Sequence, residues 1–323
     1  MTKFRKALSR IKTILSLSRN TSLKSYVNTQ EAIHHLAQLD WRIEALETRM
    51  LNAEAKLSSQ ERLGDFLKSG CFTSGQARTI LQMRNQWYAS VLPTPEMPSP
   101  AALLEKTVSL EEALERLEEL APAGFPVWQE AFHEGEKMYE GLPVDSCSLE
   151  GHAVAELFRL YLQPYLRGNV LDIGCGPQPI PRYLQSTMYP CRIHGLDPLG
   201  NSEEHPFDFY KGVAEFLPWE SNQFDAVVVA TSLDHVFLLD RSLEEIRRVL
   251  KPDGCLLLWV AFVKDAKPYD PYAKNVEKVD PYHLFHFDLP WFRELLERYY
   301  TFVEFMDVIE GGQQEFCVLK PKS

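Results

Sequence analysis

Two glycines directly after an apolar run are the first residues whose types and spacing indicate chemistry. The segment NVLDIGCGPQP, residues 169–179, ends an apolar run in Asp172 and places Gly174 and Gly176 on either side of Cys175. Glycine has no Cβ atom, so the backbone at these two positions can turn sharply and approach a ligand closely. The segment therefore predicts a ligand that lies against the main chain.

The class of ligand depends on what surrounds the glycines. Asp197 ends a second apolar run 21 residues after Gly176, where a carboxylate can accept hydrogen bonds from both hydroxyls of a ribose. A dinucleotide fingerprint needs a third glycine in the turn, and a P-loop needs Gly-Lys-Ser/Thr, but the turn reads GCGPQP. The sequence therefore predicts a ligand that carries a ribose and no essential pyrophosphate.

Histidines and aspartates near two later segments are candidates for acid–base chemistry. Asp234 and His235 follow the apolar run 225–232, and His283 and His286 lie in the segment DPYHLFHFD, residues 280–288. Histidine has a pKa close to neutrality, so it can accept a proton at working pH. His235 could instead pack against the next turn, and His283 or His286 could hydrogen-bond to a backbone carbonyl. A metal site built from these histidines and aspartates is an open alternative, but their spacing does not support it and none is predicted.

Strands that alternate with helices must position these residues. Strands are predicted at 169–174, 191–197, near 208–212, at 225–232 and from 255, with helices at 150–165, 180–186 and 241–250. Alternation of this kind predicts an α/β fold with a doubly wound, mostly parallel sheet, because parallel strands need crossover connections. Ligands of such sheets bind beyond the carboxyl ends of the strands, where the candidate residues lie.

Four motifs in this order resemble the class I S-adenosylmethionine-dependent methyltransferases, within their broad small-molecule group. VLDIGCGPQ (170–178) matches the first motif of that family, and GLDPL (195–199) matches its acidic second-strand end. GVAEFLPWESNQFDAVVVATSLDHV (212–236) and LEEIRRVLKPDGCLLL (243–258) are similar to the motifs around the fourth and fifth strands. The resemblance covers residues 150 to about 310 and implies a seven-stranded Rossmann-like sheet.

The resemblance implies S-adenosyl-L-methionine as the cofactor. It implies a binding site for the methionine part, the ribose hydroxyls and the adenine of this cofactor. The residues of that site are Asp172, Gly174, Cys175, Gly176, Asp197, Pro198, Leu199, Ala214, Glu215 and Thr231. Many family members have an aspartate at the position of Val213, so adenine recognition is left to backbone groups or to Glu215. Asp172 and Asp197 could instead cap a helix or form a turn.

The implied reaction asks the protein mainly to position the acceptor, because the sulfonium already makes the methyl group electrophilic. A hydroxyl acceptor also needs a base, for which His283 and His235 rank above His286 and Asp234. The Asp280-Pro281 turn could fix the direction of the His283 ring, whereas His286, between two phenylalanines, is expected to pack inward.

The acceptor is narrowed by what the sequence lacks. The fourth strand is followed by ATSLDH, which lacks the Asn/Asp-Pro-Pro-aromatic signature of methyltransferases that act on the amino groups of nucleic-acid bases. The nucleophilic cysteine that enzymes methylating position five of cytosine need after this strand is also absent. An acidic body also argues against nucleic acid as a partner. The favoured acceptor is a small molecule, a glycan or a lipid-linked sugar. The alternatives are a soluble metabolite of the quinone or polyketide type, and a non-catalytic cofactor-binding scaffold.

The N-terminal half reads as helical and accessory. We predict a basic amphipathic segment at 1–25, a coiled-coil helix at 26–62, a helical region with a proline-rich linker at 63–148, and the methyltransferase domain at 149–323. Residues 1–24 carry a charge of +7 within a chain of −11, which leaves −18 for the remainder. The basic segment could lie on an anionic membrane surface, dock on a partner or remain a solvated tail.

A heptad pattern follows the basic segment. Apolar residues step by three and four over three heptads, at Leu36, Leu39, Ile43, Leu46, Met50, Ala53 and Leu57. Such a seam predicts a coiled-coil homo-oligomer, although it could also pack within its own chain. Six cysteines without a CxxC pair favour reduced thiols and a cytoplasmic protein, with membrane contact, if any, at the inner face.

Overall fold

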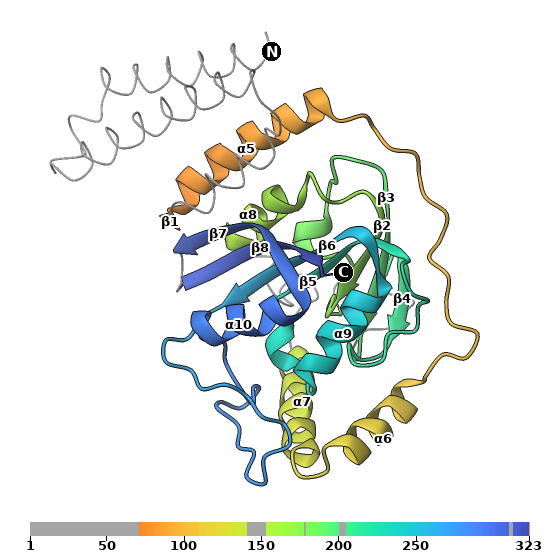
Figure 1. Cartoon of the computed structure of the whole chain (residues 1–323), viewed down its shortest axis with the longest axis vertical. Helices are drawn as coiled ribbons and strands as arrows, with labels where there is room; N and C mark the ends of the chain where they lie inside the picture. Colours follow the sequence, from red (N-terminus) through yellow and green to blue (C-terminus); the bar gives the residue numbers. More distant parts are fainter. Residues whose placement is uncertain (1–70, 141–152, 178, 200–204, 310–312, 323) are drawn as a thin grey trace, which may run out of the picture. The chain divides into compact units, whose positions relative to one another are not determined.

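The computed structural model describes residues 71–140, 153–177, 179–199, 205–309 and 313–322 (Figure 1). These residues belong to the second of two compact units, Leu67–Ser323. The predicted basic segment and coiled coil lie outside the described residues.

One sheet organises the described part of the chain. The strand order is β1-β7-β8-β6-β5-β2-β3-β4. The strands are β1 (Cys71–Phe72), β2 (Gly168–Ile173), β3 (Cys191–Asp197), β4 (Asp208–Lys211), β5 (Phe224–Ala230), β6 (Leu250–Ala261), β7 (Tyr300–Ile309) and β8 (Gln313–Pro321). Strands β2 to β6 pair in parallel, and β8 runs antiparallel to both β6 and β7. The predicted seven-stranded, mostly parallel sheet is confirmed for β2 to β8, and β1 adds a two-residue edge strand that the sequence did not indicate.

Helices cover both faces of this sheet (Figure 1). α5 (Ser74–Val91) and α8 (Ala153–Leu162) pack against each other on one side. α9 (Leu239–Val249) and α10 (Leu289–Tyr299) pack together on the other. Side chains alternate along a strand, so Leu171 and Ile173 of β2 join the core beneath α9, while Asp172 faces the opposite side of the sheet.

The accessory helices α6 (Leu110–Leu120) and α7 (Phe125–Glu140) pack onto the same core as α9. A capping box starts α6: Ser109 Oγ accepts from the Glu112 amide at 3.2 Å, and a Glu112 carboxylate oxygen accepts from the Ser109 amide at 3.0 Å. Trp128 of α7 donates from Nε1 to the carbonyl of His235 at 2.9 Å. This hydrogen bond joins the accessory region to the chain that follows β5.

The helix predicted at 180–186 is wrong. Of the described residues between β2 and β3, only Arg182–Leu184 form a helical turn, the short 3₁₀ segment η4. Three prolines explain the difference: Pro177, Pro179 and Pro181 each fix φ and lack the N–H that a helix would use. Among the described residues, no helix is long and apolar enough to cross a membrane.

Candidate functional site

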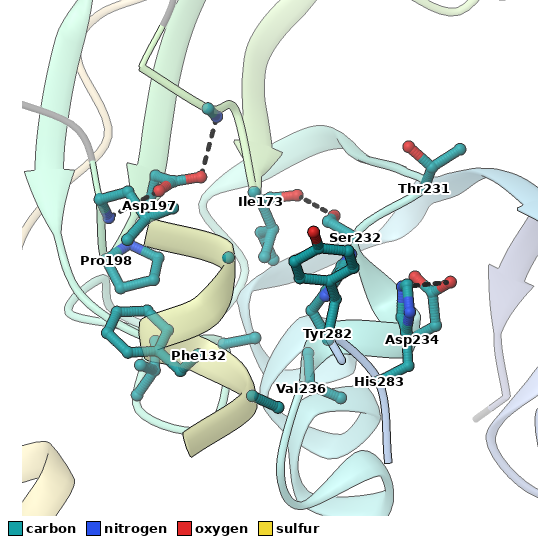
Figure 2. Close-up of a pocket in the computed structure, with 18 of the residues that line it drawn as sticks. Phe132, Ile173, Asp197, Pro198, Thr231, Ser232, Asp234, Val236, Tyr282 and His283 are labelled. Carbon is teal, nitrogen blue, oxygen red and sulfur yellow. Dashed lines mark hydrogen bonds and ion pairs between the residues drawn. The ribbon is translucent and has the colours of Figure 1, made fainter. Parts of the chain in front are cut away.

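A cavity of about 270 Å³ opens where β2, β3 and β5 end (Figure 2). Helix α7 forms one wall with Trp128, Ala131, Phe132, Gly135, Met138 and Tyr139. The predicted site residues that line it are Gly174, Gly176, Asp197, Pro198, Leu199, Ala214, Glu215, Thr231, Asp234, His235 and His283. The carboxyl ends of neighbouring parallel strands thus bring together residues that are up to 109 positions apart in the sequence.

Gly174 joins the ends of β2 and β5. Its φ is +75°, and a Cβ atom there would lie 2.3 Å from the Cβ of Ser232. Ser232 Oγ donates to the carbonyl of Ile173 at 2.7 Å (Figure 2). Gly176 also has a positive φ, +71°. Glycine is therefore required at 174 both for its backbone conformation and for the space beside Ser232.

Asp197 holds the glycine loop. Its Oδ2 accepts from the Gly176 amide at 2.8 Å, and its Oδ1 accepts from the Leu199 amide at 2.7 Å. The carboxylate is buried and still lines the cavity. Asp197 thus forms the turn that the sequence left open as an alternative, while it also lies where a ribose could bind.

Asp172 and Cys175 do not line the cavity. Asp172 is fully buried, and the Tyr183 hydroxyl donates to its carboxylate at 3.0 Å. Burial raises the pKa of Asp172 to about 8, which the hydrogen bond from Tyr183 only partly offsets. Cys175 is also fully buried. These two side chains therefore do not contact the cavity in which a ligand would bind.

Glu215 lines the cavity, but its carboxylate serves the chain before α9. Oε1 accepts from the amides of Phe237 at 2.7 Å and Leu238 at 2.9 Å. Burial raises the pKa of Glu215 above its ordinary value. Since the side chain is committed to these two amides, it is not free to bind a ligand in the way the sequence left open, and Val213 and Ala214 line the cavity beside it.

Thr231 occupies an unusual backbone conformation at the end of β5. Its φ is +51°, which is strained for a β-branched residue, and its amide donates to the carbonyl of Trp259 at 2.9 Å. Strained residues of this kind concentrate at binding and catalytic sites. The conformation turns the chain so that Thr231, Asp234 and His235 all line the cavity.

Five acid–base side chains gather at one end of the cavity, which we call the Asp–His cluster: Asp234, His235, Asp280, His283 and His286. His283 Nε2 lies 3.7 Å from Asp234 Oδ2 (Figure 2). The His235 and His283 rings have centroids 4.3 Å apart. His286 Nε2 lies 3.1 Å from Asp280 Oδ2. The sequence predicted four of these residues individually, and the fold makes them neighbours.

Asp280 orients His283. Its two carboxylate oxygens lie 2.9 and 2.8 Å from His283 Nδ1, and Oδ1 also accepts from the His283 amide at 3.0 Å. Because Nδ1 donates to Asp280, Nε2 is left as an acceptor on the cavity side. Burial and the neighbouring His235 lower the pKa of His283, although Asp234 and Asp280 oppose this.

His286 does not pack inward as expected. Its side chain is half-buried and does not line the cavity, whereas Phe285 and Phe287 on either side are buried. Four residues that line the cavity were not predicted from the sequence: Tyr282, Val236, Ser232 and Tyr183, the last of which also donates a hydrogen bond to Asp172. The turn chemistry of Asp280 was a signal for Tyr282, since Asp280 accepts from its amide at 2.8 Å. No pattern singled out the other three.

Comparison with known proteins places a family match on this part of the chain. Residues 171–258 match the family model described as a methyltransferase domain. The chain is 39% identical over 105 residues to the mitochondrial arginine-hydroxylase NDUFAF5 of Homo sapiens, covering 31% of this chain and 30% of that protein. It is 48% identical over 67 residues to the ubiquinone/menaquinone biosynthesis C-methyltransferase UbiE of Bordetella avium, covering 20% and 26%.

Solved structures include the N-methyltransferase NodS of Bradyrhizobium japonicum in complex with S-adenosyl-L-homocysteine. The match has a TM-score of 0.43 and 15% identity, and covers 61% of this chain and 99% of that one. The chain spans less than a third of the length of the two curated relatives named above.

Proposed function

We propose, on the premise that the C-terminal half of this chain is a class I S-adenosylmethionine-dependent methyltransferase domain, that the protein transfers the methyl group of this cofactor to a small-molecule hydroxyl. The observation that carries the proposal is one cavity with Asp197 at one end and the Asp–His cluster at the other. Asp197 suits the ribose of the cofactor, and the Asp–His cluster suits an acceptor that must lose a proton.

The cofactor end uses backbone groups and one carboxylate. Gly174 and Gly176 let the methionine part approach the main chain, and Leu199 and Ala214 lie against the adenine. Asp197 lies in the cavity wall at the end of β3, where its carboxylate can accept hydrogen bonds from the ribose hydroxyls. Asp172 acts from beneath the loop, where its hydrogen bond with the Tyr183 hydroxyl supports the strand end.

The acceptor end uses His283. The acceptor oxygen forms a C–O bond to the methyl carbon as the C–S bond breaks, the sulfonium becomes a neutral thioether, and the hydroxyl proton passes to Nε2 of His283. Asp280 holds the ring in the tautomer that accepts this proton and stabilises the imidazolium that forms. His235 and Asp234 flank the same nitrogen.

Two acceptor classes fit the proposal. A glycan or lipid-linked sugar follows from the predicted architecture of a basic segment and a coiled coil before the domain. A soluble metabolite of the quinone or polyketide type is favoured by the wall that α7 contributes, because Trp128, Phe132, Met138 and Tyr139 give it apolar and aromatic surface.

In this proposal the N-terminal segments mediate self-association of the chain and contact with a membrane. The seam over residues 36–57 joins copies of the chain, because pairing removes its leucines from water, and residues 1–24 contact an anionic membrane surface. Light scattering of the full chain against one that begins near residue 68 tests the first point. A monomeric full chain at tens of micromolar would place the seam within its own chain.

Labelled cofactor tests the function. Cell extract is incubated with methyl-labelled S-adenosylmethionine and the protein, and the fractions are assayed for label. Calorimetry with S-adenosyl-L-homocysteine measures binding separately. We expect binding together with label in a small-molecule or lipid fraction. Binding without any transfer would make the domain a cofactor-binding scaffold, and absence of binding would overturn the cofactor assignment itself.

A further inference from the structure

The Asp–His cluster contains more ligating groups than a general base needs. One histidine and one orienting carboxylate are sufficient for proton abstraction, and His283 with Asp280 already provides them. Asp234, His235 and His286 are additional. Asp234 and His235 each offer a ligand atom within 4.8 Å of a ring nitrogen of His283 and of each other, and His286 belongs to a second such group with Asp280 and His283. Their presence calls for a second chemical explanation.

The geometry around His283 supplies one. In the neutral imidazole, Nδ1 donates to Asp280 and Nε2 carries the lone pair, and Nε2 lies 3.7 Å from the Asp234 carboxylate. Two acceptor atoms that face each other at this distance repel unless a proton donor or a cation lies between them. His235 has a ligand nitrogen within 4.8 Å of both.

We propose that Asp234, His235 and His283 bind one divalent transition-metal ion at the acceptor end of the cavity. Two histidines and one carboxylate form a three-ligand set that leaves positions open for substrate. With metal–ligand distances near 2.0–2.1 Å, tetrahedral ligand atoms lie roughly 3.3 Å apart, so the Nε2 to Oδ2 distance has to shorten by only a few tenths of an ångström.

The surrounding residues support this assignment. A metal-bound histidine usually donates its other ring N–H to a carboxylate, and Asp280 accepts from Nδ1 of His283 in this way. His286 contacts the same carboxylate at 3.1 Å and so fixes Asp280 in turn. His283 and Asp234 come from the chain after β6 and after β5, so the ion would link the two loops that border the acceptor end.

The ion would also serve the reaction. Held by Asp234, His235 and His283, the ion would act as a Lewis acid that makes an acceptor hydroxyl more acidic. The hydroxyl proton would pass to solvent water, and its oxygen would form the C–O bond to the methyl carbon as the C–S bond breaks. In the metal-bound protein His283 is therefore a ligand, and the ion replaces it as the group that promotes loss of the proton. This role rests on the proposed function, whereas binding of the ion does not.

Metal binding can be measured without turnover. The full chain is treated with a chelator, dialysed and titrated with Co²⁺ and Zn²⁺, following the visible absorption of Co²⁺ and the heat of Zn²⁺ binding. His235→Ala and His283→Ala should each weaken binding at this site at least tenfold, and Asp280→Asn about 10–100-fold. The matched control is His133→Ala, which removes a half-exposed histidine 3.4 Å from Glu136 and should change nothing.

The outcomes separate the two proposals. If the metal affinity and the Co²⁺ absorption spectrum are unchanged in both His235→Ala and His283→Ala, the metal site is overturned, even if the protein transfers methyl groups. Loss of binding in both, with no methyl transfer under any condition, would leave the metal site in place and remove the proposed function. Circular dichroism of each variant shows whether a loss reflects unfolding, and Asp234→Asn gives a second, conservative test of the same ligand set.

Discussion

Asp197 Oδ2 accepts a hydrogen bond from the backbone amide of Gly176 at 2.8 Å, so the end of β3 holds the loop that follows β2. The same carboxylate accepts from the Leu199 amide. One side chain therefore organises two of the turns that border the cavity. Any substitution at Asp197 acts on the shape of the site as well as on a ribose bound to it.

Asp197→Ala should weaken binding of S-adenosyl-L-homocysteine. Loss of charge-assisted hydrogen bonds to the ribose costs roughly 1.5–3 kcal/mol, and loosening of the glycine loop adds to it. Calorimetry of the folded variant measures the effect, with Asp253→Ala, an exposed aspartate in β6, as the control. Unchanged affinity in folded Asp197→Ala would exclude Asp197 from the binding site.

Gly174→Ala should destabilise the domain, because the added methyl group meets Ser232 and the backbone has a φ of +75°. We expect a loss of about 1–3 kcal/mol in the free energy of unfolding, measured by urea denaturation. Gly75→Ala is the matched control: that position in α5 has open space for a Cβ atom, so alanine should be neutral or stabilising.

A second substitution separates the two causes at Gly174. Ser232→Gly removes the side chain that the new methyl group would meet, so the double variant should recover part of the lost stability and retain only the backbone strain. If Gly174→Ala is as stable as the wild type, the close approach of the two strand ends is not as the structure has it.

The sequence predicted the strands better than the connections between them. β3 was predicted with the observed bounds, because an apolar run between polar residues has one interpretation in an alternating α/β pattern. The helix at 180–186 was wrong because the alternation of strands and helices predicts a helix after β2, whereas Pro177, Pro179 and Pro181 prevent a regular one.

The site could be predicted residue by residue but not as an arrangement. Glu215 looked free to bind adenine until the fold placed the amides of Phe237 and Leu238 beside it. The contact of His283 with Asp234 spans 49 positions and depends on how two loops return to one sheet edge. No local periodicity contains that information.

His283→Ala should lower turnover by about 10²–10⁴-fold, the range for a lost general base, and leave cofactor affinity nearly unchanged, because the side chain lies at the acceptor end. His286→Ala should have a smaller effect, since it contacts Asp280 and not the cavity. Single-turnover assays measure the rate of methyl transfer, and calorimetry measures the affinity for the cofactor, so the two effects can be distinguished. Equal loss of cofactor binding in His283→Ala would instead mean that the residue shapes the cavity, and full activity would move the role to His235.

Asp172→Asn should make the domain less sensitive to alkaline pH. Burial raises the pKa of Asp172 from 3.8 to about 8, so the folded state binds a proton that the unfolded state releases. The stability that this proton contributes is fully present below pH 3.8 and is lost as the pH rises through 8. Asparagine is uncharged and keeps an acceptor for the Tyr183 hydroxyl.

The Asp172→Asn variant should therefore gain in free energy of unfolding relative to the wild type as the pH increases, measured by urea denaturation at several pH values from 5 to 9. A difference that stays constant over this range would show that Asp172 is already ionised in the folded protein.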